Sequence, residues 1–223
     1  MNIAIIPARA GSKSIINKNL IKLDNKESIT ERACRLAMQS HIFKEVVLTT
    51  DIETLWKDLE NKVTIIKRAQ ELCQDDSVML DVICDVISQR AYNVDDWIWL
   101  LQPTSPFRRI EDFKNIKNVL DSSEYKSVIS VNEVGAVHPS RMYTIHRTKM
   151  FPLRRTNFFN KQDLNPIYLR NGCFYVFKVG DFLKEKSFYI ESCFGYRMSN
   201  FNSVNIDGPE DLLIAKARIK NNE

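Results

Sequence analysis

The chain has 223 residues, 44% of them hydrophobic, and a formal net charge of +4. This length and apolar content suffice for one buried core, so we expect a single domain spanning residues 1–223. The charge is mild and its acids and bases are interspersed over most of the length, which fits a small anionic substrate and lacks the concentrated basic face typical of nucleic-acid binding.

The cysteines and histidines show no metal-binding pattern. The five cysteines form no C-x-x-C pair and lie in apolar or mixed stretches, which predicts reduced, partly buried thiols. The three histidines lack zinc-type spacing. No signal-peptide pattern is present, and the densest apolar run, residues 97–101, is too short for a membrane helix. We therefore expect a cytoplasmic protein that does not bind a membrane.

The first predicted strand, residues 3–6, ends at Pro7 and opens into a polar loop. Backbone N–H groups in such a loop can face an anion while its cations offset the charge of a triphosphate. The loop is neither a Walker P-loop nor a dinucleotide fingerprint, because Gly11 is its only glycine. On this motif alone, a solvated turn is the alternative to a phosphate site. The basic and amide side chains of the loop are Arg9, Lys13, Lys18 and Asn19.

The middle of the chain alternates between strand and helix patterns. Thr50-Asp51 forms a polar corner of the kind that caps a following helix, and Val78 belongs to an apolar stripe that we expect in the core. Five strands and four helices in turn predict a doubly wound, mostly parallel α/β sheet with right-handed crossovers. The predicted strands after the first are 45–49, 63–66, 97–101 and 127–134, and three of the helices are 28–40, 77–89 and 111–120.

A rigid polar turn follows the strongest strand, residues 97–101, which we expect to be a central parallel strand covered on both faces. Pro103 and Pro106 stiffen this turn. Open α/β sheets place ligand groups at the carboxyl ends of such strands, so the turn is a candidate binding element. The alternative is that the turn only connects a strand to a helix and has no role in binding or catalysis.

Three motifs occur in the order found in one enzyme family. Ile-Pro-Ala-Arg-x-Gly-Ser-Lys at residues 6–13, followed by Lys18-Asn19, resembles the opening of the acylneuraminate cytidylyltransferases, the CMP-sialic acid synthetases. The most specific match is Leu-Leu-Gln-Pro-Thr-Ser-Pro-Phe-Arg at residues 100–108, and residues 203–211 give the third. Related Kdo-activating enzymes carry Ser-Thr-Arg-Leu-Pro near Ser12. The resemblance therefore implies the sialic-acid branch and a Rossmann-like nucleotidyltransferase fold.

The resemblance implies a CTP site built from the opening loop and a second segment. Arg68 begins the family pattern Arg-x-x-Glu-Leu-x-x-Asp, a region that lies beside the base and ribose in the family. Arg9 and Lys18 are expected to be catalytic as well, since they would stabilise charge on the departing pyrophosphate. The nucleotide-binding residues implied are Ala8, Arg9, Ala10, Gly11, Ser12, Lys13, Asn19, Arg68 and Ser77.

Residues 138–170 interrupt the alternation with basic and aromatic side chains. Single-stranded nucleic acid is one interpretation, but the basic excess is confined to this insertion, so we expect no nucleic-acid partner. A solvated β-rich arm that forms a subunit interface is another. The resemblance implies a small dimerisation arm whose basic residues help hold the sugar carboxylate, and hence a homodimer.

The sugar-binding residues implied by the resemblance come from the turn, the arm and the segment after it. Gln102 is expected near the acceptor sugar. The family commonly has an arginine two residues before Asn171, whereas here Leu169 holds that place and Arg170 is adjacent. Asn171-Gly172 also suits a tight turn with positive φ before a strand. The implied set is Gln102, Thr104, Ser105, Arg155, Arg170 and Asn171.

The last motif implies a site for Mg²⁺ or Mn²⁺. A short predicted strand ends in Asp207, and Pro209 opens a helix, a position where proline is tolerated. The family has Asp-x-Asp here, but this chain has Asn205 in place of the first aspartate. Asp207 is also expected to be catalytic, with Asn205 and Asp211 as further ligands, because Mg²⁺ needs only one or two carboxylates beside substrate phosphates. The alternative is that Asp207 caps the last helix.

The resemblance thus implies a cytidylyltransferase that joins CTP to a nine-carbon 2-ulosonic acid and releases pyrophosphate. Two alternatives stay open: activation of Kdo or 8-amino-Kdo, and a nucleotide- or sugar-binding homologue whose metal chemistry is impaired by Asn205.

Overall fold

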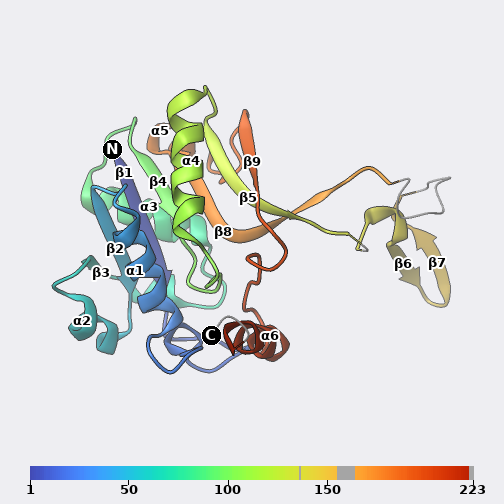
Figure 1. The fold of residues 1–223 in the computed structure, drawn as a ribbon, viewed down its shortest axis with the longest axis horizontal. Helices are drawn as coiled ribbons and strands as arrows, with labels where there is room; N and C mark the ends of the chain where they lie inside the picture. Colours follow the sequence, from blue (N-terminus) through green and yellow to red (C-terminus); the bar gives the residue numbers. More distant parts are fainter. Residues whose placement is uncertain (136, 155–163, 221–223) are drawn as a thin grey trace.

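A computed structural model describes residues 1–135, 137–154 and 164–220, and its centre is one seven-stranded sheet (Figure 1). The order of strands is β3-β2-β1-β4-β8-β5-β9. The β3-β2-β1-β4 half is parallel, β8 runs antiparallel to both of its neighbours, and β9 is parallel to β5. The strands are β1 (Asn2–Ala8), β2 (Glu45–Thr50), β3 (Thr64–Lys67), β4 (Trp97–Leu100), β5 (Ser127–Glu133), β8 (Tyr168–Lys178) and β9 (Cys193–Arg197).

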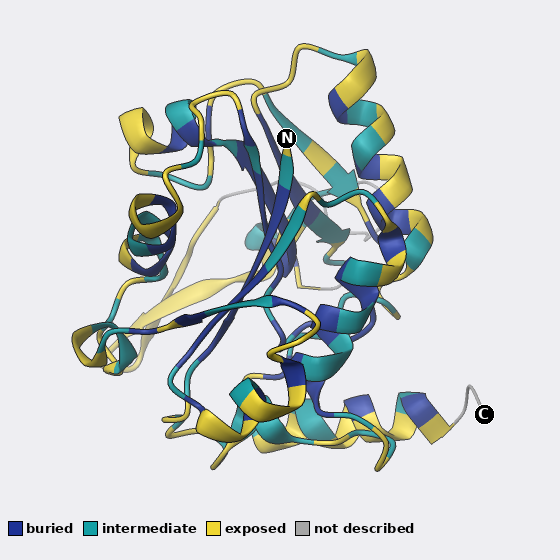
Figure 2. Cartoon of the chain, turned by 90° about the vertical axis from the view of Figure 1, so that its left-hand side faces the viewer, coloured by how far each residue is buried: buried dark blue, intermediate teal, exposed yellow. Residues whose placement is uncertain are grey.

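Helices cover both faces of the sheet (Figures 1 and 2). Helices α1, α2 and α4 supply buried side chains to one core cluster, and α3 and α5 supply them to another on the opposite face. The mostly parallel, doubly wound sheet is confirmed. The α-helices are α1 (Ile29–Ser40), α2 (Glu53–Leu59), α3 (Met79–Arg90), α4 (Ile110–Ser122), α5 (Val179–Glu185) and α6 (Pro209–Lys220), and the 3₁₀ turns are η1 (Lys18–Leu20), η2 (Gln70–Cys73) and η3 (Pro139–Arg141).

Strand β4 is buried on both faces, as its unbroken apolar run predicts. Ile98 and Leu100 belong to the cluster under α3, whereas Trp99 faces α4 and stacks on Phe113 with ring centroids 6.3 Å apart. Trp99 and Phe113 are both fully buried. Large aromatic side chains of this kind contribute much of a core's burial energy, so β4 is a rigid base for the turn that follows it.

The sheet departs from strict alternation after β5. The chain leaves the sheet there, forms an outlying hairpin of β6 (Tyr143–His146) and β7 (Lys149–Pro152), and returns as β8 between β4 and β5 (Figure 1). The interruption at residues 138–170 was expected from the sequence, but the return of β8 between β4 and β5 was not, because pairing order depends on contacts between segments distant in sequence. Strand β4 is therefore parallel to β1 but antiparallel to β8.

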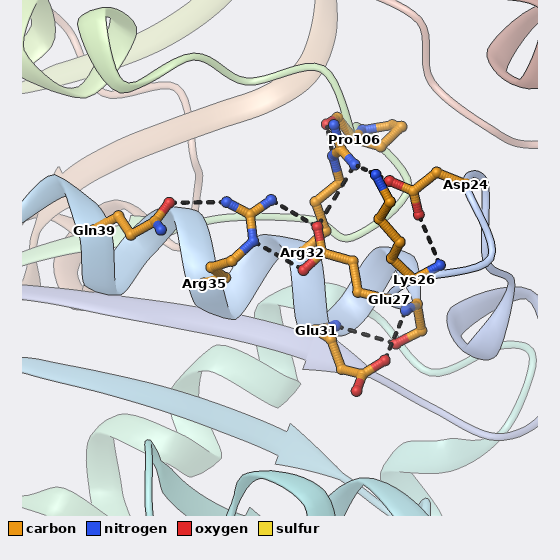
Figure 3. Close-up of polar contacts among 9 residues, drawn as sticks. Asp24, Lys26, Glu27, Glu31, Arg32, Arg35, Gln39 and Pro106 are labelled. Carbon is orange, nitrogen blue, oxygen red and sulfur yellow. Dashed lines mark hydrogen bonds and ion pairs between the residues drawn. The ribbon is translucent and has the colours of Figure 1, made fainter. Parts of the chain in front are cut away.

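Helix α1 begins at a capping box that is tied to the turn after β4 (Figure 3). The Glu31 backbone N–H donates to Ser28 Oγ, and the Ser28 N–H donates to the Glu31 carboxylate. One turn further on, Arg32 Nε donates to the Pro106 carbonyl oxygen at 3.1 Å, while its NH1 lies 3.3 Å from Asp24 Oδ2. The Arg32 contact thus holds the start of α1 against the turn after β4, which contains Pro106.

Three local predictions were wrong. Asp51 does not cap α2, because Ile52 is the N-cap residue and has no side-chain cap bond. Val78 is exposed rather than part of the core; it is the N-cap residue of α3 and lies just before the helix. Residues 203–207, predicted to include a short strand, form none; the Ile206 N–H instead donates to the Thr104 carbonyl. Among the described residues, no helix is long and apolar enough to span a bilayer.

Candidate active site

A cleft opens at the edge of the sheet where β1 and β4 end. Because both strands are parallel and central, their carboxyl ends place two loops side by side at this edge. A wider hollow of about 620 Å³, between the end of α1 and β3, contains none of the predicted site residues, so we place the chemistry in the cleft. Its lining residues are Pro7, Arg9, Gly11, Ser12, Lys18, Asn19, Arg68, Met79, Gln102, Pro103 and Thr104.

The opening loop is held in shape by its own polar groups. The Asn19 side-chain amide donates to the Arg9 carbonyl at 2.8 Å, and the Thr30 hydroxyl donates to the Asn19 carbonyl at 2.7 Å. On the other side of the loop, the Ala10 backbone N–H donates to Asp51 Oδ1 at 2.7 Å. Ala8 is the buried last residue of β1. The Asp51 carboxylate, expected to cap a helix, therefore anchors the loop instead.

Two of the loop's cations meet one carboxylate. Arg9 NH2 lies 2.9 Å from Asp75 Oδ1, and Lys13 Nζ lies 2.7 Å from Asp75 Oδ2. The hydrogen bonds from Lys13 and Arg9 hold the pKa of Asp75 below its usual range, and the same contact raises the pKa of Lys13. In this structure the two cations of the loop are therefore paired with a carboxylate of the chain itself.

The second predicted nucleotide segment contributes a buried arginine. Arg68 is 4% exposed and donates from NH2 to the Thr49 carbonyl at 3.0 Å, and its burial lowers the pKa of the guanidinium. Arg68 lines the cleft, whereas Ser77 does not; its hydroxyl donates to the Glu71 carbonyl at 3.0 Å. Met79, at the start of α3, adds an apolar wall that the sequence did not single out.

The turn after β4 is organised by Arg108. Its guanidinium donates to the carbonyl oxygens of Gln102, Ser105 and Cys173 at 2.6, 2.8 and 2.7 Å. Burial lowers the pKa of Arg108 to about 10, so the group stays protonated at neutral pH. The three bonds join the turn to β8 and leave the Gln102 and Thr104 side of the turn facing the cleft.

Asn171 and Gly172 lie inside β8, at an irregularity of its pairing with β5, and not in a tight turn before a strand. The register shifts there, so that Val131 pairs with Arg170 while Ile129 pairs with Tyr175. Ser130 fills the bulge: its hydroxyl donates to Asn171 Oδ1 at 2.6 Å and accepts from the Phe174 N–H at 2.7 Å. The predicted turn was wrong, although the positive φ of Gly172, 76°, was correct.

Gly172 brings the β8 backbone close to the turn after β4. A Cβ at this position would lie 2.9 Å from Gln102 Oε1, 3.3 Å from Ser105 Oγ and 3.6 Å from Asn205 Oδ1. Ser105 Oγ in turn lies 3.3 Å from both the Asn171 carbonyl and Asn205 Oδ1. The absence of a side chain at Gly172 therefore leaves room for Gln102, Ser105 and Asn205 to approach one another.

The predicted metal residues form one cluster beside Lys18. Asp207 is exposed, its Oδ1 lies 3.7 Å from Lys18 Nζ, and its Oδ2 accepts from Asn205 Nδ2 at 2.5 Å. Lys18 Nζ also donates to the Asp207 carbonyl at 3.1 Å. Asp211 Oδ2 instead accepts the N–H groups of Asp207 and Gly208 at 3.0 and 2.8 Å. Asp211, and not Asp207, therefore closes the turn into α6.

The Asp207 carboxylate fits a divalent ion shared with substrate phosphates, whereas Asn205 directs its Nδ2 to Asp207 and its Oδ1 to Ser105. Asp207 offers an accessible carboxylate, and Asn205 lies within hydrogen-bond distance of it. The described ranges contain no cluster of three or more His, Cys, Asp or Glu residues that could hold an ion by themselves. Mg²⁺ typically retains several waters and uses one or two carboxylates with phosphates, which is the arrangement that Asp207 can supply.

Of the predicted sugar-binding residues in the described part of the chain, Gln102 and Thr104 line the cleft, whereas Ser105, Arg170 and Asn171 do not. Arg155 lies outside the described residues. Arg170 is exposed on β8, where its charge acts on Tyr175 and opposes the rise in the pKa of that phenol caused by burial. Sequence reasoning did not single out Ser130, expected Asp51 to cap a helix, and noted Asp75 only as the end of the family pattern that begins at Arg68. All three support the site through contacts with distant segments. Arg108, in contrast, ends the most specific motif and could have been found there.

A family model described as Cytidylyltransferase matches residues 3–201. The chain belongs to the cytidylyltransferase family. The chain is 30% identical over 217 residues to the N-acylneuraminate cytidylyltransferase of Streptococcus agalactiae serotype V, a match that covers 95% of this chain and 51% of that protein. It is 29% identical to the CMP-N,N'-diacetyllegionaminic acid synthase of Legionella pneumophila, over 99% of this chain and 97% of that one.

The cytidylyltransferase fold is also found among solved structures. A CMP:2-keto-3-deoxy-manno-octonic acid synthetase complexed with CTP matches with a TM-score of 0.72, covering 100% of this chain and 99% of that one. Its sequence identity is 14%, so the likeness bears on the fold alone. The chain spans about half the length of the N-acylneuraminate cytidylyltransferase from Streptococcus agalactiae.

Proposed function

We propose that the chain transfers CMP from CTP to a nine-carbon 2-ulosonic acid of the sialic-acid type, with release of pyrophosphate. The observation that carries the proposal is the shared cleft, in which Arg9 and Lys18 of the opening loop lie together with Gln102 and Thr104 of the turn after β4. Cations for a triphosphate thus lie beside polar groups for an acceptor. The names of the relatives from Streptococcus agalactiae and Legionella pneumophila support an acylated sugar acid.

The proposed step is displacement at the α-phosphorus. A bond forms from the sugar hydroxyl oxygen to the α-phosphorus, the bond to the bridging oxygen breaks, pyrophosphate leaves, and the hydroxyl proton passes to solvent. Such transfer depends on positioning and charge stabilisation and needs no covalent nucleophile on the protein. Arg9, Lys13 and Lys18 would stabilise the departing pyrophosphate, Arg68 would support the nucleotide, and Gln102 would orient the sugar.

Asp207, next to Asn205, would hold Mg²⁺ or Mn²⁺, and the bound ion supplies neutralisation of phosphate oxygens. Asn205 lowers the negative charge of this site by one relative to the family pattern. An amide beside Asp207 has a compensating property, since its N–H donates to the carboxylate and avoids the repulsion between two adjacent aspartates. Because CTP is an intracellular metabolite, the proposed reaction takes place in the cytoplasm.

Pyrophosphate release tests the function. The protein would be incubated with Mg²⁺ and CTP, or UTP as a matched control, against N-acetylneuraminic, legionaminic and pseudaminic acids, Kdo and 8-amino-Kdo. We expect release with CTP and one of the nine-carbon acids. Release with Kdo or its amino analogue alone would contradict the sialic-acid assignment. CTP binding without release from any acid would favour the metal-impaired homologue, in which Asn205→Asp should restore turnover.

We also propose that residues 1–223 act as one domain whose arm, residues 138–170, forms a homodimer interface. The β6–β7 hairpin carries exposed apolar side chains, and Ile145 is 69% exposed opposite the exposed Met150. Tyr143, paired with Pro152, lies on the same face two residues away. A protruding hairpin with such a face gains stability when a second copy covers it.

Ile145→Asp is therefore expected to shift the protein from dimer to monomer, because a carboxylate would be buried in the interface. The measurement is molar mass by light scattering after size-exclusion chromatography. Thr144→Asp is the matched control, since Thr144 points to the opposite face of the same strand. A wild-type protein that elutes as a monomer would contradict the proposal.

A further inference from the structure

Two cations of the opening loop, Arg9 and Lys13, are paired with the carboxylate of Asp75. Arg9 directs both terminal nitrogens to one segment: NH1 donates to the Cys73 carbonyl at 3.1 Å, and NH2 lies 2.9 Å from Asp75 Oδ1. Lys13 reaches the other oxygen of the same carboxylate at 2.7 Å. Each carboxylate oxygen of Asp75 therefore pairs with one cation, an arrangement that a phosphate group would reproduce.

Exposure makes this contact exchangeable. The side chains of Lys13 and Asp75 are 85% and 40% exposed, and ion pairs in such positions contribute little stability because water and salt screen them. A di- or triphosphate carries several negative charges and can engage both cations together. Arg9 also lines the cleft, so a ligand bound there meets one of the two cations directly.

We propose that Asp75 is a positioning residue that acts as an internal counter-anion: it holds Arg9 and Lys13 together before nucleotide binds, yields them to the phosphates, and recovers them when pyrophosphate leaves. The inference rests on the proposed function in assigning Arg9 and Lys13 to phosphate. In the empty site the carboxylate offsets the repulsion between the two cations, which is evident in the lowering effect of Arg9 on the pKa of Lys13. On product release, the same carboxylate competes with pyrophosphate.

Binding of inorganic pyrophosphate by isothermal titration calorimetry, without CTP or sugar, tests the proposal. Asp75→Asn removes the competing charge and keeps the size of the side chain. We expect the variant to bind pyrophosphate about fivefold more tightly than wild type, as expected for the loss of a competing exposed ion pair. Pyrophosphate binding by the variant should also depend more steeply on salt concentration than binding by the wild type. Arg9 and Lys13 are no longer paired with Asp75, so pyrophosphate and the anions of the salt compete for them directly.

Asp76→Asn is the matched control, since Asp76 is an adjacent exposed carboxylate that forms no ion pair in the described part of the chain and raises the pKa of Lys13 by less than Asp75 does. It should leave the pyrophosphate affinity unchanged within about twofold. In a Lys13→Met background, the gain from Asp75→Asn should shrink, a coupling that a merely structural role of Asp75 would not produce.

Equal or weaker pyrophosphate binding by Asp75→Asn would overturn the proposal, and so would the same gain from Asp76→Asn. Absence of binding in both wild type and Asp75→Asn would overturn it too, because uncovered cations would then form no anion site. None of these outcomes depends on turnover. Failure of this inference is therefore distinguishable from failure of the proposed cytidylyl transfer, which is measured with CTP and sugar acid.

Discussion

Arg108→Met is expected to lower the free energy of unfolding by about 3–5 kcal/mol, since three carbonyl oxygens would lose their donor. Methionine can fill much of the volume but cannot donate to the carbonyls of Gln102, Ser105 and Cys173. The guanidinium also lies 5.5 Å from the Phe174 ring centroid, a further favourable contact that the variant loses. Urea denaturation followed by circular dichroism measures the difference.

The neighbouring arginine provides the control for this prediction. Arg109 is exposed and pairs with exposed Glu111, so Arg109→Met should change stability by about 0.5 kcal/mol or less. Arg108→Lys is informative as well, because one ammonium group cannot span three carbonyls in the planar arrangement of a guanidinium. A loss below about 1 kcal/mol for Arg108→Met would show that the turn after β4 is held by other contacts.

Asp207→Ala is expected to reduce Mg²⁺-dependent pyrophosphate release by about 100-fold or more, the scale of losing one preorganised electrostatic group. Asp207 is the accessible carboxylate of its cluster, and Lys18, which lines the cleft, contacts it directly. Because its side chain is 73% exposed, the substitution should leave the unfolding free energy nearly unchanged. Steady-state rates at several Mg²⁺ concentrations provide the measurement.

Glu210→Ala is the matched control for Asp207→Ala, since Glu210 is an exposed acid in the first turn of α6, three residues after Asp207. It should retain the wild-type rate. Full Mg²⁺-dependent turnover by Asp207→Ala would contradict the metal assignment. Asp211→Ala is expected to act differently, by destabilising the start of α6, because its carboxylate accepts the Asp207 and Gly208 N–H groups.

Asn205 links the two halves of the site. Its amide nitrogen donates to Asp207, while its oxygen lies 3.3 Å from Ser105 Oγ below Gly172. The asparagine that stands in place of the family's aspartate is thus hydrogen-bonded to both Asp207 and Ser105. The activity assay with Asn205→Asp compares the charge that the family pattern supplies with the hydrogen bond that this chain retains.

The elements that local patterns specify were predictable from sequence. The apolar run at residues 97–101 specified a strand covered on both faces, because burial on two sides needs no polar alternation. Ser28 and Glu31 supply both halves of a capping box, so the start of α1 depends on four consecutive residues. The sequence also indicated a polar loop after β1 and a polar turn after β4, but their meeting at one edge depends on the parallel pairing of β1 with β4, which only the structure shows.

Only the tertiary structure decided how distant residues meet. The insertion of β8 between β4 and β5 created the bulge at Ser130, and this bulge brought Gly172 against Gln102. The ion pair of Asp75 with Arg9 joins residues 66 positions apart in the sequence. The hydrogen bond from the Ala10 N–H to Asp51 joins residues 41 positions apart. A local sequence pattern indicates whether a segment is buried or extended, but it carries no information on which side chain a remote backbone places beside it. That choice was made by strand order and packing.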